Sequence, residues 1–334
     1  AGHPEYGLLP GIEVTTGPLG QGFANGVGFA IAQKYMAERY NQPNFDLFDY
    51  KIYTICSDGD MMEGITSEAA SMAGHLKLGN MIYLYDDNHI SIEGDTDLTF
   101  DEDVARRFEA YGWHVQALPD GNDLKALSTA IENAQKETHR PSLIKVRTHI
   151  GYGSPNKMDT AAAHGSPLGE EEVKLVKENF GFDPNKYFDV SDEVLNFYRE
   201  AGQKGIEKEN TWNDLFKEYK NKYKELAEEY ELFASGKLPK DWKKDLPVFK
   251  GGDKIETRKA SGKMLNAIAD YLPNLIGGSA DLAPSTDTNL NQYKSFSSEN
   301  FGGRNFHFGI REHAMGAILN GLALSKFIIP YGAT

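Results

Sequence analysis

A regular alternation of short apolar, β-prone runs with helical stretches is the feature that most constrains how this chain can fold. In chain order, the runs and the helical stretches between them occupy residues 52–56, 66–78, 81–85, 101–111, 113–118, 123–137 and 142–146. Strands and helices that alternate at this spacing predict an α/β fold built on a parallel sheet. Ligands of such sheets bind at the carboxyl ends of the strands, so the residues that follow the runs are the first candidates for a site.

The second half of the chain divides into a loop, a charged helical segment and a second α/β pattern. Residues 151–168 have neither helical nor strand periodicity, and a loop of this length is usually functional or disordered. Residues 206–245 are rich in Lys and Glu, with apolar side chains at helical spacing, which predicts an amphipathic surface helix. A second pattern follows, with a helix at 256–271, a strand at 275–276 and a helix at 312–325. A chain of 334 residues with this organisation favours about two domains.

Charge and cysteine content limit the partners that the chain can bind. It carries 35 basic and 49 acidic side chains, for a formal net charge of −14. This excess of negative charge argues against nucleic acid or an anionic membrane as a partner, and a phosphate ligand would need a local cluster of cations. The single cysteine, Cys56, excludes an intramolecular disulfide framework and fits a reducing compartment. No run approaches the ~20 apolar residues of a spanning helix, so we expect a cytoplasmic protein without a membrane partner.

The two ends of the chain lack the polar character common at natural termini. The sequence begins with Ala1 in a Gly- and Pro-rich stretch and closes on an apolar run at residues 327–332, which is typical of a strand entering a sheet. We therefore expect the sequence to be a segment of something longer.

Polar residues that could bind a cation follow two of the predicted strands. Asp58 and Gly59 come after the run at 52–56, and Asn88 comes after the run at 81–85. Adjacent parallel strands would bring Asp58 and Asn88 to one edge of the sheet, where carboxylate, amide and backbone oxygens suit a hard divalent cation and a diphosphate. Asp-Gly and Asp-Asn pairs are also common in turns. From spacing alone, a metal site and a pair of turns both remain open.

Longer motifs add a family resemblance to this pattern. Asp58-Gly59 followed by Asn88 is similar to the thiamine diphosphate motif, with Ser57 in place of the first glycine of Gly-Asp-Gly. Six further stretches resemble the transketolase family, namely residues 2–5 (GHPE), 15–22 (TTGPLGQG), 108–113 (FEAYGW), 257–259 (TRK), 277–282 (GGSADL) and 309–316 (GIREHAMG). The resemblance extends in order through essentially the whole chain.

The resemblance implies a thiamine diphosphate-binding α/β fold with parallel sheets. It implies a diphosphate (PP) domain over residues 1–215, an interdomain helix and linker over 216–252, and the start of a pyrimidine (PYR) domain over 253–334. By the same resemblance, the first part of the PP domain would precede residue 1. The rest of the PYR domain and a third domain would follow residue 334.

The resemblance also implies roles for individual residues at the cofactor. Asp58, Asn88 and the backbone carbonyl of Ile90 would hold Mg²⁺ or Ca²⁺, which would clamp the cofactor diphosphate. Glu312 would hydrogen-bond the aminopyrimidine ring and favour the imino tautomer that deprotonates the thiazolium carbon. Asp281 would face the cofactor from a partner subunit. The residues implied to contact the cofactor are Gly17, Leu19, Gly59, His164, Asp281 and Glu312.

A second implied group binds the substrate. His3 would contact the donor sugar, and His164 would contact the diphosphate and the reacting hydroxyls, since imidazole exchanges protons near neutral pH. Arg258 and Ser285 would bind the sugar phosphate and so supply the local cluster that the acidic chain requires. Glu63 would lie near the subunit interface.

The activity implied is that of a transketolase, the reversible transfer of a two-carbon ketol unit from a ketose phosphate such as xylulose 5-phosphate to an aldose phosphate, in the pentose phosphate pathway. The family works as a homodimer with each active site between subunits. Two alternatives stay open, a dihydroxyacetone synthase with formaldehyde as acceptor, and a non-catalytic fragment. Because each site would need the missing parts of the PYR domain, we expect the segment alone to be inactive.

Overall fold

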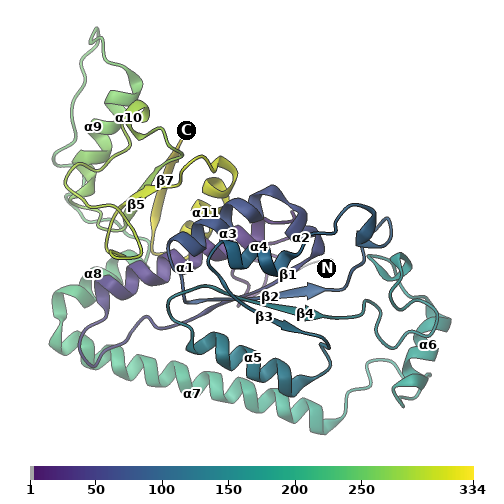
Figure 1. Ribbon diagram of the computed structural model, residues 1–334. Helices are drawn as coiled ribbons and strands as arrows, with labels where there is room; N and C mark the ends of the chain where they lie inside the picture. The colour runs from purple at the N-terminus through teal and green to yellow at the C-terminus, as the bar shows by residue number, and fades with distance from the viewer. Residues whose placement is uncertain (1–3) are drawn as a thin grey trace.

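The computed structural model describes residues 4–334 and confirms a parallel α/β fold. Within that range the first domain is built on a four-stranded parallel sheet with the order β1-β2-β4-β3 (Figure 1). Its strands are β1 (Ile52–Ser57), β2 (Met81–Asp87), β3 (His114–Leu118) and β4 (Ser142–Arg147). All four runs predicted as strands are therefore strands, with ends that differ from the predictions by one or two residues.

Both faces of this sheet are covered because its central strands are apolar on both sides. Tyr83 and Leu143 belong to the core that includes residues of α1 (Gln21–Tyr40) and α3 (Gly64–His75). Ile82 and Ile144 precede and follow these residues along their strands, so they face the other side of the sheet and belong to a smaller core with residues of α5 (Leu124–Lys136). The short helices α2 (Asp58–Met62) and α4 (Val104–Ala110) lie on the α1 and α3 side of the sheet, where Met61 and Phe108 join the larger core.

The charged segment after the first domain is longer and less regular than the single helix predicted over 206–245. After α6 (Glu170–Asn179), a helix α7 runs over Asp192–Lys222 and α8 over Lys224–Ala234. The chain leaves helical geometry at Tyr223, with φ −124° and ψ 57°, so the prediction of one helix was wrong. The first turns of α7 carry no buried residue, which is why periodicity did not mark its start. Residue 215 lies inside α7.

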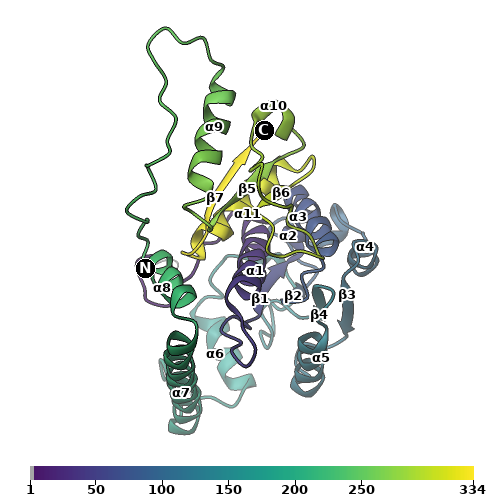
Figure 2. The ribbon, with the colours of Figure 1, turned by 90° about the vertical axis from the view of Figure 1, so that its left-hand side faces the viewer.

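The second domain contains a smaller parallel sheet with the order β6-β5-β7 among the described residues. Its elements are α9 (Thr257–Ala269), β5 (Leu275–Ser279), α10 (Ala283–Thr286), β6 (Asn305–His307), α11 (Glu312–Leu324) and β7 (Ile329–Ala333). The apolar run at the end of the chain does form a strand, β7. The segment that joins α8 to α9 loops out beyond α9 (Figure 2).

Helix α1, which the sequence analysis did not identify, lies between the two sheets and packs against α11 (Figures 1 and 2). The two helices can approach closely because Gly28 and Gly321 have no side chain at the crossing. A Cβ on Gly28 would stand 2.2 Å from the Ile318 carbonyl oxygen, and a Cβ on Gly321 would stand 2.0 Å from the Asn25 carbonyl oxygen. Most of α1 is buried, so it has no polar face that would produce an amphipathic pattern. Among the residues described, no helix has the length and apolarity needed to cross a membrane.

Candidate functional site

The carboxyl edge of the first sheet brings together the two candidate cation ligands that follow β1 and β2. These strands are parallel neighbours, and Ser57 pairs with Asp86, so Asp58 and Asn88 follow at the same edge. Asp58 is the first residue of α2 and only 3% exposed. Its Oδ1 accepts a hydrogen bond from the Tyr85 hydroxyl at 2.6 Å, and its Oδ2 accepts one from the backbone N–H of His89 at 3.1 Å.

The electrostatics of Asp58 favour an additional positive charge beside it. Burial raises the pKa of Asp58, and the nearby Asp87 carboxylate raises it further, against the opposing hydrogen bond from Tyr85. Asp87 is itself buried and pairs with Lys145 Nζ at 3.2 Å. A divalent cation at Asp58 would offset the unfavourable burial of its charge.

The remaining candidate ligands lie on the turn after β2. His89 has φ +66°, and Asn88 Oδ1 accepts a hydrogen bond from the backbone N–H of Ile90 at 2.9 Å, so one lone pair of the amide oxygen stays free. In the described part of the chain, no three His, Cys, Asp or Glu side chains cluster so that they could hold a metal. The candidate set is therefore one carboxylate, one amide and one carbonyl, all oxygen, which fits Mg²⁺ or Ca²⁺ once diphosphate oxygens or water complete the shell.

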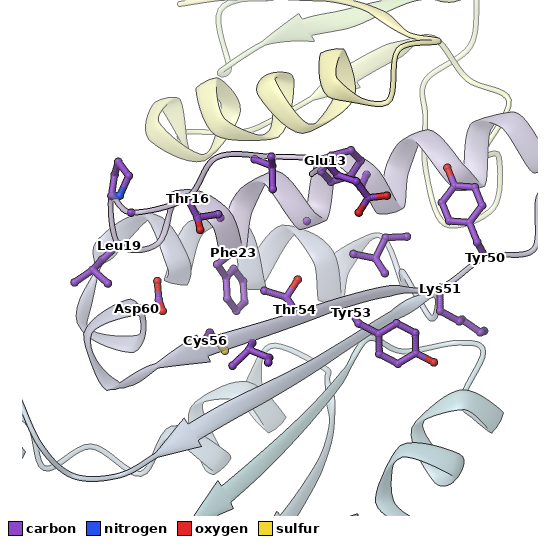
Figure 3. Close-up of a pocket in the computed structure, with 18 residues that line it drawn as sticks. Glu13, Thr16, Leu19, Phe23, Tyr50, Lys51, Tyr53, Thr54, Cys56 and Asp60 are labelled. Atoms are coloured by element: carbon purple, nitrogen blue, oxygen red, sulfur yellow. The ribbon is translucent and has the colours of Figure 1, made fainter. Parts of the chain in front are cut away.

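A cleft of about 630 Å³ lies between β1 and the segment before α1, with Leu19 and Asp60 at one end and Tyr50 and Lys51 at the other (Figure 3). Gly17 and Leu19, both predicted to contact the cofactor, line it. Asp58 and Asn88 do not.

The turn that holds Leu19 is joined to the end of β1 by Asp60. Its Oδ1 accepts from the Gly20 N–H at 2.7 Å and its Oδ2 from the Ser57 N–H at 2.8 Å. The Leu19 side chain reaches Gly59, since a Cβ on Gly59 would stand 2.8 Å from Leu19 Cδ1. The structure therefore places the Leu19 side chain against Gly59, the residue that follows Asp58 in the chain.

His164 lies in the loop that leaves the same sheet edge after β4. The Thr148 hydroxyl at the start of this loop hydrogen-bonds Asp86 Oδ1. The side chain of His164 is half-buried, and its Nδ1 is a buried atom without a hydrogen-bond partner in the structure. His3, the other predicted active-site histidine, lies outside the described residues.

Arg258 and Ser285, the predicted phosphate ligands, are brought together in the second domain. Arg258 Nη1 donates to the Ser285 carbonyl oxygen at 3.3 Å, and both residues are exposed. Arg258 Nε also pairs with Glu256 Oε2 at 2.5 Å. The hydrogen bond from Arg258 lowers the pKa of Glu256, so a phosphate would have to compete with an ionised carboxylate for this guanidinium.

Glu312, Asp281 and Glu63 are exposed, and none of them lines the cleft. Glu312 is the first residue of α11, and Asp281 has φ +62° in the turn after β5. Glu63 lies between α2 and α3. The three side chains are therefore exposed to solvent and are not gathered around Asp58.

Sequence analysis missed several residues that support the candidate site. Tyr85, which contacts Asp58, was part of a run treated only as an apolar strand. Glu68 accepts a hydrogen bond from Ala314 N at 2.9 Å, and nothing in the local pattern of α3 indicates this. Glu172 binds the loop that carries His164. A polar hydroxyl inside a buried strand was the one available signal, at Tyr85.

Two family profiles match consecutive parts of the chain. The profile described as transketolase, thiamine diphosphate binding domain matches residues 1–239, and transketolase, pyrimidine binding domain matches residues 253–334. The chain is 50% identical over 333 residues to the transketolase of Halalkalibacterium halodurans and 52% identical over 336 residues to that of a Nostoc species. Each match covers 100% of this chain, and the chain spans about half the length of these curated relatives.

Solved structures give the same relationship. A mutant transketolase from Pichia stipitis, in complex with xylulose 5-phosphate, superposes with a TM-score of 0.96 at 44% identity, and the match covers 99% of this chain and 50% of that one. The transketolase from Leishmania mexicana superposes with a TM-score of 0.96 at 42% identity over the same shares.

Proposed function

The chain belongs to the transketolase family, and from that premise we propose that the protein transfers a two-carbon ketol unit reversibly from a ketose phosphate to an aldose phosphate. The family profile identifies the cofactor as thiamine diphosphate. We propose xylulose 5-phosphate as a donor, supported by its presence in the Pichia stipitis structure, and a place in the pentose phosphate pathway. Since the relatives are twice as long as this chain, the proposed active unit is a protein of family length.

The observation that carries the proposal is the buried Asp58 carboxylate at the same sheet edge as Asn88. In the proposal, Asp58, Asn88 and the carbonyl of Ile90 hold Mg²⁺ or Ca²⁺ against the cofactor diphosphate. Tyr85 and the His89 N–H keep the Asp58 carboxylate oriented. When bound, thiamine diphosphate supplies the electron sink for carbon–carbon bond cleavage.

The protein's own residues then orient groups and move protons. Gly17, Leu19 and Gly59 line the cofactor in this proposal, and Glu312 shares a proton with a ring nitrogen of its aminopyrimidine. His164 contacts the diphosphate and, with His3, the hydroxyls of the sugar, because imidazole can accept or donate a proton near neutral pH.

Substrate binding is assigned to the second domain. Arg258 and Ser285 bind the phosphate of the sugar, which gives an acidic protein the local positive site it needs. Asp281 reaches the cofactor of the other subunit in a cytoplasmic homodimer, and Glu63 lies near the subunit interface. The exposure of Asp281, Glu312 and Glu63 supports this arrangement. We keep residues 1–215, 216–252 and 253–334 as the proposed domain limits.

The test is a ketol-transfer assay with the family-length protein, thiamine diphosphate and Mg²⁺. We expect turnover of xylulose 5-phosphate with ribose 5-phosphate as acceptor. Turnover with formaldehyde but not with an aldose phosphate would indicate a dihydroxyacetone synthase instead. A protein that binds the cofactor without transfer to either acceptor would contradict the proposed activity. The 334-residue chain alone is expected to show no transfer, because each proposed site draws on the PYR domain of a second subunit and the chain holds only the start of that domain.

A further inference from the structure

Two side chains of the following helix, Glu172 and Asn179, hydrogen-bond the loop after β4, residues 148–168, and of the two only Glu172 is buried. Glu172 in the first turn of α6 is 8% exposed. Its Oε1 accepts hydrogen bonds from the Ser154 hydroxyl at 2.5 Å and from the Asn156 N–H at 2.9 Å, and its Oε2 accepts one from Asn156 Nδ2 at 2.9 Å. Buried carboxylates need such partners, and these three donors together bind one side chain to one short stretch of loop.

The charge of Glu172 is part of this arrangement. The hydrogen bond from Ser154, followed by those from Asn156, lowers the pKa of Glu172, so the side chain is an anion at neutral pH. An anion accepts all three hydrogen bonds at once, whereas a protonated carboxyl would have to donate at one of its oxygens.

A continuous set of contacts leads from Glu172 to His164. The Ser154 hydroxyl also accepts from the Lys157 N–H at 3.1 Å, and the Lys157 carbonyl oxygen accepts from the Thr160 hydroxyl at 2.8 Å. The single helical turn that follows, Ala161–Ala163, ends at His164, whose N–H donates to the Ala161 carbonyl oxygen at 3.0 Å.

The two sides of the loop also touch directly. A Cβ on Gly151 would stand 3.1 Å from the Cβ of Ala163, which leaves little room for the turn before His164 to shift. Lys157 Nζ donates to the Leu168 carbonyl oxygen at 2.8 Å and so joins the middle of the loop to its end. The loop is therefore one packed unit, joined to α6 by the buried Glu172 and by Asn179, whose Nδ2 donates to the Gly153 carbonyl oxygen at 3.0 Å.

The imidazole of His164 depends on this unit for its position. Its Nδ1 is buried without a hydrogen-bond partner, so no side-chain hydrogen bond at that nitrogen fixes the ring. The backbone of the loop is what sets where the imidazole points.

We propose that Glu172 is a positioning residue for His164, which it holds at the carboxyl edge of the sheet through the loop 148–168. The inference rests on the proposed function, in which His164 contacts the cofactor diphosphate and the sugar hydroxyls. A group that binds phosphate and moves protons must be held within a fraction of an ångström, and a buried supporting hydrogen-bond network provides that.

The experiment uses the family-length protein with Glu172→Ala, and Glu171→Ala as the matched control. Glu171 is the preceding residue on α6, and its exposed carboxylate pairs with Lys174. For Glu172→Ala we expect amide hydrogen exchange in residues 150–164 to become about 10-fold faster or more, with the exchange of α1 and α11 unchanged. We also expect thiamine diphosphate, in the presence of Mg²⁺, to bind about 10-fold more weakly, and kcat at saturating cofactor to fall about 10-fold. Glu171→Ala should match the unsubstituted protein.

A double variant that restores the hydrogen bonds between positions 156 and 172 distinguishes a loss of loop positioning from a general loss of stability. Asn156→Asp alone would set two carboxylates against each other, but combined with Glu172→Gln the new amide can donate to the new carboxylate while its oxygen still accepts from Ser154 and the backbone. We expect the double variant to return loop exchange and cofactor affinity to within about 3-fold of the starting protein, which a loss of overall stability would not produce.

Either of two results would overturn the inference. One is unchanged loop exchange in Glu172→Ala, and the other is faster exchange with undiminished cofactor affinity and turnover. If the unsubstituted protein neither binds thiamine diphosphate nor transfers ketol units, the proposed function fails. In that case the exchange data alone decide whether Glu172 anchors the loop.

Discussion

Glu68 of the first domain accepts a hydrogen bond from the backbone N–H of Ala314 in the second, with 2.9 Å between Oε2 and N. Ala314 lies in the first turn of α11, where free N–H groups and the helix dipole both favour an anion. Arg311 Nη2 donates to the Ser71 hydroxyl at 3.2 Å beside it. Helix α3 therefore fixes the start of α11, and with it the position of Glu312.

Removing this cap should destabilise the contact between the domains. For Glu68→Ala we expect a loss of about 1–2 kcal/mol in the free energy of unfolding, because the Ala314 N–H loses its charged partner. Glu68→Gln retains an acceptor and should lose less than half as much. Chemical denaturation of both variants checks this. If both variants are as stable as the unsubstituted protein, the hydrogen bond from Ala314 contributes nothing to stability.

The close crossing of α1 and α11 predicts that Gly28 cannot be replaced by a larger residue without loss of stability. Gly28→Ala would force a methyl group to 2.2 Å from the Ile318 carbonyl oxygen, so the helices must separate. We expect a loss of about 2–3 kcal/mol in unfolding free energy, as for other overpacked cores. Gly205→Ala on α7 is the control, since a Cβ there has no other atom within 4 Å. It should be neutral or stabilising by up to about 1 kcal/mol. Similar effects at both positions would contradict close packing at Gly28.

Asp58→Asn should change stability and cofactor binding in opposite directions. Burial raises the pKa of Asp58, so in the cofactor-free protein its charge disfavours folding at neutral pH. The substitution should therefore stabilise the cofactor-free protein near pH 7. That advantage should shrink as the pH falls toward the raised pKa, where the native carboxyl takes up a proton.

The same variant loses a charged cation ligand. We expect Mg²⁺-dependent thiamine diphosphate affinity to fall about 100-fold, equivalent to ~3 kcal/mol, measured by titration calorimetry. Addition of EDTA to the unsubstituted protein should reproduce the loss. Unchanged affinity in Asp58→Asn would remove Asp58 from the cation site.

Arg258→Ala should act on phosphorylated substrates selectively. Loss of a charge-assisted contact with the phosphate predicts a KM for xylulose 5-phosphate about 10- to 100-fold higher. The KM for hydroxypyruvate, which has no phosphate, should stay the same. Equal increases for both substrates would mean that Arg258 supports the fold instead.

Glu256→Gln tests whether the Glu256 carboxylate competes with the substrate phosphate for the Arg258 guanidinium. Because Glu256 Oε2 pairs with Arg258 Nε in the free chain, removal of the carboxylate charge should leave the guanidinium more available. We expect the KM for xylulose 5-phosphate to fall about 2- to 5-fold, the direction opposite to Arg258→Ala, because a solvent-exposed ion pair is weak.

Glu312→Gln should leave the protein folded but reduce the rate of ketol transfer. The side chain is exposed in this chain, so its loss removes no core contact, and we expect the melting temperature to change by less than about 2 °C. In the proposed mechanism the rate at saturating cofactor falls by about two orders of magnitude or more, because an amide cannot share a proton with the cofactor ring. Near-normal turnover at saturating cofactor would exclude Glu312 from the mechanism.

The sequence by itself determined the features that depend on neighbours along the chain. The apolar runs at 52–56 and 81–85 predict buried parallel strands, and the polar residues that end them predict that Asp58 and Asn88 follow at one sheet edge. The structure confirms both the strands and their parallel pairing. The resemblance to the transketolase family rests on contiguous motifs and is confirmed by the profile matches.

Only the tertiary structure decided which distant residues meet. Helix α1 escaped prediction because burial on most sides removes the amphipathic pattern. The helix predicted over 206–245 proved to be parts of two helices because the chain leaves helical geometry at Tyr223, and the start of α7 was missed because its first turns bury nothing. The contact of Glu68 with Ala314 joins residues 246 positions apart, and that of Arg258 with Ser285 spans 27. Periodicity reports the local backbone and one buried face, whereas such pairings depend on how whole elements pack, which no short window of sequence contains.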